Sequence, residues 1–423
     1  MTPASTLLGS AQPRTLTRDA GTIPQIAETR SVPVVLADFQ RVVLSPLLPQ
    51  DELKRIQVHF MTIAQSAKRG VTGKSEREEL HRTISERMAR YGASSTHISQ
   101  RQVGVLHSEF VVHAGDAGPG SYGDLRVATG EPLDARMTLF EQTACNVLER
   151  VYDDSATPPD GIVHVTCSGY VSPSPVQMYL SRRGWLTTSV THSYHMGCYG
   201  AFPAVRTALG LVGSSYSSLP TPSKRVDLVH TEFLSLHFDL LGEQPDAFVT
   251  STLFADGFIK YSAYPQAEFA KRDGRGLRVL AFEERILPDS LPEMTLRPGP
   301  LQFDMSLSKR VPFLIRDSIA DFVVSVSAQA GLDFEREKSR MIFAIHPGGP
   351  AILTQIRNRL GIDESQIALS RQILFENGNM ASATAPHIWE QITASDDIPV
   401  GCKILTMAFG PGLTVIGAVF EKV

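Results

Sequence analysis

The sequence predicts an α/β protein in which helices cover buried strands. Three observations indicate this class: short apolar runs rich in β-branched residues, longer amphipathic runs between them, and alternation of the two from residue 33 onward. Strands that alternate with helices form α/β layers rather than a sandwich or a helix bundle. The predicted strands are 161–169, 186–197, 225–238, 246–264, 277–287, 341–349 and 402–423, and the predicted helices are 137–152, 198–212, 351–361 and 385–393.

The predicted strands end at glycine, proline or charged residues. "GIVHVTCSG" (161–169) and "MIFAIHPGG" (341–349) are short apolar runs that end in glycine, as strands buried on both faces do. "DAFVTSTLFADGFIKYSAY" (246–264) is rich in β-branched and aromatic residues, which favours a strand. The closing segment, 402–423, divides into two strands around a glycine-rich turn. Charge and glycine at "AKRDGRG" (270–276) indicate a soft boundary.

The predicted helices carry apolar residues at helical spacing. "MTLFEQTACNVLERVY" (137–152) places Cys145 in its apolar stripe, where a thiol acts as a small core residue. "CYGAFPAVRTALGLV" (198–212) directly follows a predicted strand. "AILTQIRNRLG" (351–361) and "APHIWEQIT" (385–393) complete the alternation in the C-terminal part of the chain.

Composition and charge exclude several kinds of protein. The chain is 42% hydrophobic and 20% charged, and its net charge of −4 comes with no long basic run. We therefore expect no nucleic-acid partner and, since no apolar stretch approaches about 20 residues, no membrane span. Residues 1–32 lack the pattern of a secretory signal and predict a poorly ordered extension. Four cysteines without a CxxC pair argue against disulfides and zinc, and indicate the cytoplasm.

Two local patterns resemble binding motifs but have simpler explanations. "KRGVTGKSE" (68–76) lacks the first glycine of a phosphate-binding loop, because that position is Lys68, and is interpreted as a solvated loop. His192 and His195 alternate along a predicted strand without a third ligand at a recognisable spacing. They are interpreted as structural histidines, so no metal site is expected.

Cys198 stands where a predicted strand ending at Gly197 gives way to a predicted helix. A thiol at a helix N-terminus lies near the positive end of the helix dipole, which favours the thiolate and lowers the pKa. Gly197 and Gly200 leave room for close approach of a substrate. By itself, this pattern leaves Cys198 equally a nucleophile or a buried structural thiol.

Two further residues complete a candidate catalytic set. His346 comes at the end of a buried strand, directly before "PGG", and Asn379 follows Gly378 in a turn. Active-site residues of α/β sheets gather at the carboxyl ends of strands. Cysteine, histidine and asparagine supply a nucleophile, a base and a hydrogen-bond donor. Papain-like proteases use the same order, but their local sequence around the cysteine is absent here.

Four motifs in order resemble the chalcone synthase family, the type III polyketide synthases: "GC" (197–198), "HPGGPAIL" (346–353), "GNMASA" (378–383) and "FGPGLTV" (409–415). The similarity extends through most of residues 160–423 and is weaker over 33–160. "TCSGYVSPSPVQ" (166–177) and "HTEFLSLHFD" (230–239) look more like bacterial alkylresorcinol and alkylpyrone synthases than plant chalcone synthases.

The resemblance implies a thiolase fold of two similar layered α/β halves (αβαβα), usually paired as a homodimer. Residues 33–275 would form the N-terminal half, which carries the cysteine, and residues 276–423 the C-terminal half, which carries the histidine and asparagine. The resemblance implies no metal or redox cofactor. Malonyl-CoA and an acyl thioester, carried by coenzyme A or by an acyl carrier protein, would be the substrates.

The resemblance also assigns chemical roles. Cys198 would be acylated by the starter, and His346 would keep the thiolate poised. His346 and Asn379 would stabilise the enolate that forms when malonyl-CoA loses carbon dioxide, because two oriented N–H donors in a dry pocket stabilise negative charge on an oxygen. The carbanion would then attack the acyl–Cys198 thioester.

Several pocket residues follow from the same comparison. Phe254 matches a family phenylalanine at the junction of substrate tunnel and cavity, and Met305 replaces a second one. Leu296 replaces a small glycine and His237 replaces a threonine, which argues against a chalcone-type product. The other pocket candidates are Cys167, Ser168, Phe409, Gly410 and Gly412.

The predicted tunnel entrance differs from that of plant enzymes, which hold coenzyme A phosphates with several basic residues. "SERMARYGASSTHISQR" (85–101) offers arginines, of which Arg90 and Arg101 are candidates, but no comparable lysine pattern. Gly348 and Gly349 are further candidates for contact with coenzyme A.

The sequence thus favours a type III polyketide synthase that extends a fatty acyl starter and closes a resorcinol, phloroglucinol or pyrone ring. A ketoacyl synthase III-type enzyme that performs one condensation is the nearest alternative, and a cysteine hydrolase is a remote one. A non-catalytic partner protein with the same fold is disfavoured, since a scaffold does not need the Cys–His–Asn set.

Overall fold

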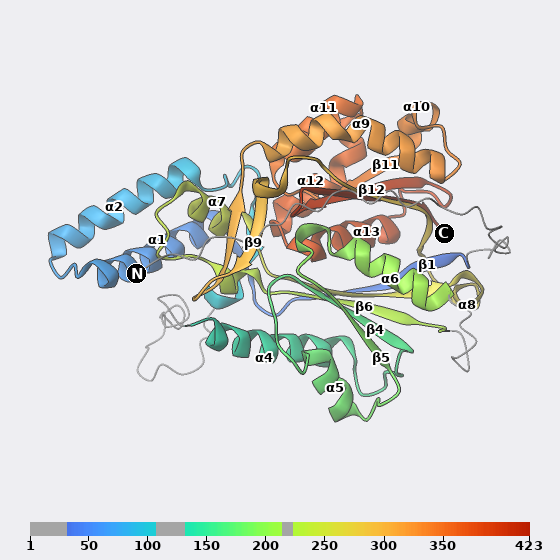
Figure 1. Cartoon of the computed structure of the whole chain (residues 1–423), viewed down its shortest axis with the longest axis horizontal. Coiled ribbons are helices and arrows are strands. Elements are labelled where there is room, and N and C mark those ends of the chain that lie inside the picture. The colour runs from blue at the N-terminus through green and yellow to red at the C-terminus, as the bar shows by residue number, and fades with distance from the viewer. Residues whose placement is uncertain (1–31, 107–131, 214–222) are drawn as a thin grey trace, which may run out of the picture. The chain divides into compact units, whose positions relative to one another are not determined.

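A mixed sheet runs through the protein in the computed structural model, which describes residues 32–106, 132–213 and 223–423. The extension predicted for residues 1–32 lies, apart from Val32, outside the described residues. Within the described ranges the sheet has nine strands in the order β11-β12-β13-β8-β1-β7-β6-β4-β5 (Figure 1). They are β1 Val34–Val42, β4 Gly161–Thr166, β5 Ser189–Tyr194, β6 Val226–Glu232, β7 Gly257–Pro265, β8 Leu277–Ile286, β11 Ile342–Ile345, β12 Lys403–Gly410 and β13 Thr414–Lys422.

The sheet repeats one pattern of strand directions in its two halves. In the first half β1 is antiparallel to β7, β7 is antiparallel to β6, and β6 is parallel to β4. In the second half β8, β13, β12 and β11 repeat these relations in the same order. The halves meet where β1 pairs with β8 at Val35–Arg278 and Leu36–Leu277. This repetition confirms the predicted thiolase fold of two similar α/β halves.

Helices form three layers around the two halves of the sheet (Figure 1). Helices α6 (Ala201–Gly213) and α13 (Thr384–Ala394) lie in the middle layer, between the strands of the two halves. The rings of Phe202 and Trp389 meet there edge to face with centroids 5.5 Å apart. The outer layers contain α4 Leu133–Val151 and α5 Pro175–Arg183 on one side, and α9 Val311–Gln329, α10 Phe334–Glu337 and α11 Pro350–Leu360 on the other.

The remaining elements extend from this layered body. Helices α1 (Gln50–Arg69) and α2 (Lys74–Tyr91) form an antiparallel pair that projects from it (Figure 1). Their connection, Gly70–Gly73, lies in the segment 68–76 that was interpreted as a solvated loop. The other elements are β2 Leu47–Pro49, β3 Gln100–Gln102, α7 Pro245–Leu253, α8 Gln266–Phe269, β9 Met294–Pro298, β10 Phe303–Leu307 and α12 Ala368–Asn377. Short 3-10 turns are η1 Gly104–Leu106, η3 Gly197–Tyr199, η4 Leu234–His237, η5 Leu291–Glu293, η6 Lys338–Arg340, η7 Glu364–Ile367 and η8 Ala381–Ala383.

The sequence predicts a strand over the whole segment 246–264, and this prediction is wrong for its first part. Its first part is the helix α7, and only 257–264 belongs to β7. Pro245 occupies the first turn of α7, where a missing N–H has no cost. The hydroxyls of Thr250 and Thr252 donate to carbonyls one turn back, Asp246 at 2.8 Å and Phe248 at 2.6 Å. Burial of one helix face and these hydrogen bonds outweigh the β preference of the residues.

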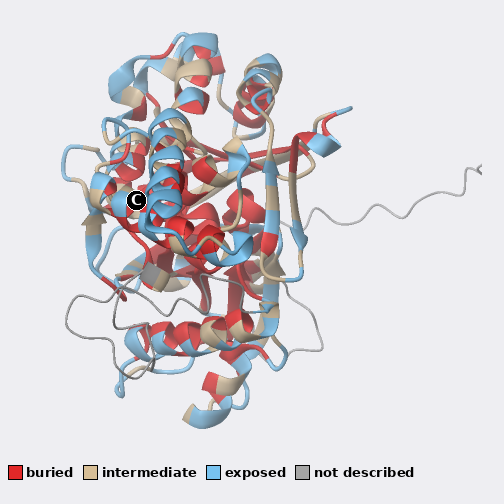
Figure 2. Ribbon diagram, turned by 90° about the vertical axis from the view of Figure 1, so that its left-hand side faces the viewer, coloured by how far each residue is buried: buried red, intermediate tan, exposed pale blue. Residues whose placement is uncertain are grey.

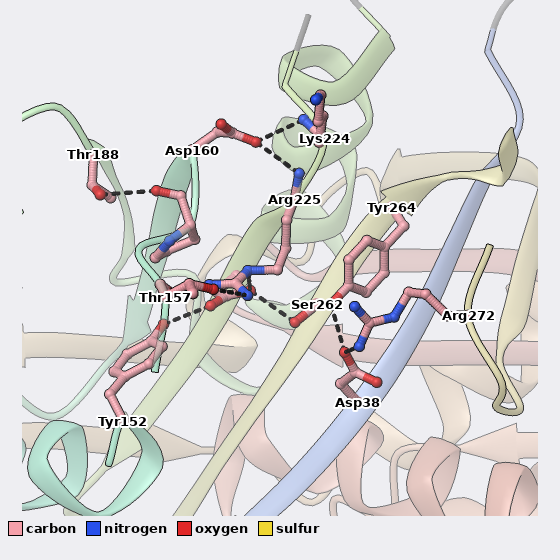
Figure 3. A network of polar contacts seen from close by, with 12 residues as sticks. Asp38, Tyr152, Thr157, Asp160, Thr188, Lys224, Arg225, Ser262, Tyr264 and Arg272 are labelled. Atoms are coloured by element: carbon pink, nitrogen blue, oxygen red, sulfur yellow. Dashed lines mark hydrogen bonds and ion pairs between the residues drawn. The ribbon is translucent and has the colours of Figure 1, made fainter. Parts of the chain in front are cut away.

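Buried residues concentrate in the strands and in the middle helices (Figure 2). One buried carboxyl group, that of Asp227 on β6, has its own partners. The hydroxyls of Tyr152 and Ser262 donate to it at 2.9 Å and 2.7 Å, and Nε of Arg225 lies 3.4 Å away. In Figure 3 the side chains of Tyr152 at the end of α4, Arg225 directly before β6 and Ser262 on β7 converge. Within the described part of the chain, no helix is long and apolar enough to cross a membrane.

Candidate active site

Cys198 lies in a tight turn between β5 and α6. Gly197 has φ 66° and starts the 3-10 turn η3, which holds the cysteine ahead of the helix. A Cβ atom at Gly197 would lie 2.9 Å from Cδ of Pro411, so only glycine fits against the C-terminal half at this point. The Cys198 side chain is buried, with 7% of its surface exposed.

His346 directly follows β11, as expected. Its backbone N–H donates to the carbonyl of Met407 at 2.8 Å, which continues the pairing of β11 with β12. Neither ring nitrogen has a hydrogen-bond partner among the described residues, although the side chain is almost completely buried. A buried polar group without a partner has a free-energy cost, and such groups occur where a ligand completes the bonding.

Asn379 reaches Cys198 from the C-terminal half. Gly378, with φ 73°, turns the chain after α12, and the Asn379 N–H donates to the carbonyl of Leu253 at 2.9 Å. Its Oδ1 accepts from the Ala381 N–H at 2.9 Å, which fixes the orientation of the amide. The Cys198 sulfur lies 3.9 Å from Oδ1 and 4.0 Å from Nδ2 of Asn379.

One cavity of about 460 Å³ brings the three residues together. Cys198, His346 and Asn379 all line it, beside apolar side chains of α7, β10, α9 and α11. The sequence separates these three residues widely, and the fold brings all three to the lining of one cavity.

A second cavity of about 310 Å³ adjoins the first. Phe254 and Met305 line both cavities and therefore stand at their junction, where the resemblance put them. The predicted pocket residues Leu296, His237 and Cys167 line this second cavity.

His237 is a fixed wall of the second cavity rather than a free base. Its ring stacks on Phe303 with centroids 4.4 Å apart. Nδ1 accepts from the Phe303 N–H at 3.0 Å and Nε2 donates to the Ser168 carbonyl at 2.8 Å. Burial lowers the pKa of His237 to about 4, so the ring is neutral.

Three predicted pocket residues do not line either cavity, whereas Phe409 lines the first. Ser168 is buried in the protein, and its hydroxyl accepts from the Phe233 N–H at 2.8 Å. Gly410 packs against Tyr199, whose Cδ1 lies 2.2 Å from the place of a Cβ. Gly412 has φ 131° in the turn between β12 and β13. The loop thus supports the turn of Cys198 through Gly410 and Pro411 and reaches the first cavity through Phe409. A pocket role for Ser168, Gly410 and Gly412 stays a prediction.

The candidates for contact with coenzyme A divide into two groups. Gly348 and Gly349 line the first cavity, and Arg90 is exposed, with its guanidinium over the ring of Tyr91, another lining residue. Arg101 is fully buried, so the expectation that it contacts a phosphate is wrong. Its guanidinium instead donates to Gln50 at 2.7 Å and to the carbonyls of Ser251 and Phe254 at 2.9 Å and 2.5 Å.

The resting charge state of the site differs from the sequence-based expectation. Burial, followed by the charge of Glu232, raises the pKa of Cys198 to about 12, although the Asn379 amide acts in the opposite direction. Burial lowers the pKa of His346 to about 3. Burial therefore outweighs the effect of the helix N-terminus, since Cys198 lies in η3 and two residues, Tyr199 and Gly200, separate it from α6. Both groups are neutral at rest.

Sequence reasoning missed Glu232, which ends β6 and is fully buried beside Cys167. Burial raises its pKa to about 6. One feature of the sequence could have pointed to Glu232: it is the one acidic residue between Asp227 and Asp239, in a segment that is otherwise apolar or neutral.

The geometry defines a class of protein: a thiolase fold that brings a cysteine, a histidine and an asparagine from its two halves to one cavity. Residues 279–423 match the family described as chalcone and stilbene synthases, C-terminal domain. The chain therefore resembles the type III polyketide synthases, as its motifs indicated, and the match to the chalcone and stilbene synthase family covers its C-terminal third.

Curated relatives support this assignment. Type III polyketide synthase A of Arabidopsis thaliana is 27% identical over 286 residues, 63% of this chain and 67% of that protein. The 1,3,6,8-tetrahydroxynaphthalene synthase of Streptomyces coelicolor is 26% identical over 272 residues, 63% of this chain and 68% of that protein. "Probable polyketide synthase 1" of Dictyostelium discoideum is 30% identical over 232 residues, which are 54% of this chain but only 7% of that longer protein.

Solved structures agree on the fold. PKS-I from the brown alga Ectocarpus siliculosus superposes with a TM-score of 0.76 at 20% identity, over 93% of this chain and 99% of the other. The C-terminal type III polyketide synthase domain of Steely1 from Dictyostelium gives 0.71 at 22% identity, over 92% and 99%.

Proposed function

We propose that the protein is a type III polyketide synthase that loads a fatty acyl starter on Cys198 and extends it with malonyl-CoA. It then closes the chain to a resorcinol, phloroglucinol or pyrone. The observation that carries this proposal is the meeting of Cys198, His346 and Asn379 in one cavity that continues past Phe254 into a second one.

The loading step uses the neutral pair of Cys198 and His346. The thiol proton moves to a ring nitrogen of His346, and the sulfur attacks the carbonyl of the acyl thioester. A new C–S bond forms, the thiol of the carrier leaves, and it takes up the proton. Because the pKa of Cys198 is raised at rest, this transfer accompanies substrate binding rather than preceding it.

The extension step uses N–H donors. The His346 ring, through its protonated nitrogen, and Nδ2 of Asn379 donate to the thioester oxygen of malonyl-CoA, where negative charge develops as carbon dioxide leaves. The resulting carbanion attacks the acyl–Cys198 carbonyl, so that a C–C bond forms and the C–S bond to Cys198 breaks. The chain is then two carbons longer.

The second cavity supports repeated extension over a single condensation. This cavity of about 310 Å³ meets the one that contains Cys198 at Phe254 and Met305, which line both. A growing chain needs such space, whereas the product of one condensation does not. We expect the starter to arrive on coenzyme A or an acyl carrier protein, and the enzyme to work as a homodimer in the cytoplasm without a metal or redox cofactor.

The test is incubation with malonyl-CoA and acyl-CoAs of varied length, with products identified by mass spectrometry. We expect ring-containing products with two or more added acetate units, and none with Cys198→Ala. Cys145→Ala is the matched control, because Cys145 is a buried thiol of α4 that lines neither cavity.

Two results would contradict the proposal. An open product with one added unit would indicate a ketoacyl synthase III-type enzyme. Hydrolysis of acyl-CoA without any dependence on malonyl-CoA would indicate a hydrolase.

A further inference from the structure

Glu232 is a buried carboxylate with donors from both halves of the protein. Its Oε2 accepts from the Cys167 N–H at 2.9 Å, from the Ser168 hydroxyl at 3.3 Å and from the Cys167 thiol at 3.4 Å. Its Oε1 accepts a short hydrogen bond from the Ser382 hydroxyl. Cys167 and Ser168 follow β4 in the N-terminal half, whereas Ser382 belongs to η8, after β11 in the C-terminal half.

Ser382 lies in the turn that presents Asn379. Ala381, between them, has φ 45°, a left-handed conformation that has a free-energy cost for a residue with a side chain. The turn is thus strained, and contacts outside it must hold it in place. The link from Ser382 to Glu232 is such a contact.

The Ser382 hydroxyl has a second fixed partner. Nδ1 of His230 lies 3.0 Å from it, and Nε2 of His230 lies 3.2 Å from the Tyr261 hydroxyl. Because Ser382 donates to Glu232, it accepts from Nδ1–H of His230, and Nε2 then accepts from Tyr261. The position of the hydroxyl is therefore determined from two sides.

We propose that Glu232 is a positioning residue for the candidate active site: it ties the turn that carries Asn379 to the strand end that carries Cys167, and so sets the Asn379 amide against the Cys198 sulfur. The expected effect of Glu232 on catalysis rests on the proposed function. The dependence of the Cys198 environment on Glu232 is a matter of geometry and does not rest on it.

The charge of Glu232 gives the proposal a readout that a purely structural role would lack. The titratable groups that face it are Cys167 after β4, Cys198 in η3 and, through Ser382, His230 on β6. Of these, His230 is neutral because burial lowers its pKa. The negative charge of Glu232 contributes to the raised pKa of Cys198, so its removal should favour the thiolate.

The experiment compares Glu232→Gln, Ser382→Ala and the control Asp227→Asn in the full chain. Glutamine keeps the shape of Glu232 without its charge, but its amide nitrogen cannot accept a hydrogen bond, so the donors on one of the two oxygens lose their acceptor. Ser382→Ala keeps the charge and removes the link to η8. Asp227 is also a buried carboxylate of β6 that accepts from hydroxyls, but it lies at the other end of the strand. Two rates are measured: decarboxylation of malonyl-CoA, and iodoacetamide labelling of Cys198 against pH, read by peptide mass spectrometry.

We expect iodoacetamide to label Cys198 about threefold to tenfold faster in Glu232→Gln than in the wild type near pH 8.5. Without the charge of Glu232 the pKa of Cys198 is raised less, so more of the thiol is present as thiolate. Glu232→Gln and Ser382→Ala should both decarboxylate malonyl-CoA about tenfold more slowly, since the Asn379 donor moves. Asp227→Asn should change neither rate by more than about twofold.

Wild-type decarboxylation rates in both Glu232→Gln and Ser382→Ala would overturn the proposal. If Glu232→Gln does not fold, the decarboxylation rate of Ser382→Ala alone tests the proposal, and a wild-type rate overturns it. If the wild-type protein itself leaves malonyl-CoA intact, the proposed function fails and the labelling assay decides the role of Glu232 alone. A pH profile of Glu232→Gln identical to that of the wild type would then overturn it.

Discussion

Cys198 illustrates how burial and local sequence compete at a single residue. Its place ahead of α6 favours the thiolate, but burial of the side chain, followed by the charge of Glu232, raises its pKa to about 12. His346, beside the same cavity, has its pKa lowered to about 3 for the same reason. The pair is therefore uncharged until a substrate enters.

The first prediction concerns this charge state. Below a raised pKa the thiolate fraction grows about tenfold with each pH unit, so iodoacetamide labelling of Cys198 should rise steadily from about pH 7 to pH 10. Labelling at each pH is followed by peptide mass spectrometry on the substrate-free protein. Cys198→Ala identifies the relevant peptide.

A labelling rate that levels off below about pH 8 would contradict this prediction. It would mean that an ion pair between Cys198 and His346 already exists in the resting protein.

At the scale of elements, the site depends on turns that fit against each other across the two halves. The turn of Cys198 packs on the "FGPGL" loop, where Gly197 meets Pro411 and Gly410 meets Tyr199. The turn of Asn379 packs on the end of α7, where Phe254 and Asn379 form an isolated parallel bridge. Short turns between buried elements therefore set the positions of the candidate catalytic side chains.

The second prediction is that Gly197→Ala destabilises the protein by about 2 kcal/mol or more, because a left-handed φ of 66° adds to the contact with Pro411. The free energy of unfolding is measured with urea. Gly210→Ala is the control, since nothing lies within 4 Å of the new Cβ in α6 and alanine favours the helix.

Equal stability of Gly197→Ala and wild type would show that the turn can move away from Pro411. The geometry proposed for Cys198 would then be one of several that the chain tolerates.

The element scale also shows where sequence patterns failed. The segment 246–264 contains many β-branched residues, yet its first part forms α7 because its buried face and Pro245 suit a helix. Strands such as β4, β11, β12 and β13 were predictable because continuous apolar runs with glycine at their ends have few other solutions.

At the scale of the whole molecule, Arg101 joins parts of the chain that are far apart in sequence. It donates to Gln50 of α1 and to carbonyls at the end of α7, and its Cδ lies 2.8 Å from the place of a Cβ on Gly378. Burial lowers its pKa to about 9, which leaves it charged near neutral pH. The guanidinium therefore holds the Phe254 carbonyl, and the aliphatic part of the Arg101 side chain packs against the turn of Asn379.

The third prediction follows from this position. Arg101→Met should lower the free energy of unfolding by about 3 kcal/mol, because buried carbonyls lose their donor. Arg90→Met is the matched control on the exposed side of α2 and should change it by about 0.5 kcal/mol or less.

An unchanged stability of Arg101→Met would contradict the structural role given to this residue. It would also reopen the expectation that Arg101 binds a phosphate.

The sequence by itself determined the α/β class, most of the strands and the identity of Cys198, His346 and Asn379. These follow from local patterns, such as apolar runs, glycine turns and motifs in a fixed order. Such patterns are present in the sequence whatever the tertiary structure is. The division at residues 275–276 stays a prediction.

Only the tertiary structure decided the charge state of the pair, the burial of Arg101, the places of Ser168, Gly410 and Gly412, and the role open to Glu232. Each of these depends on which groups from distant segments exclude water from one another. Desolvation and long-range hydrogen bonds are properties of the packed interior, and no local pattern of residues encodes them.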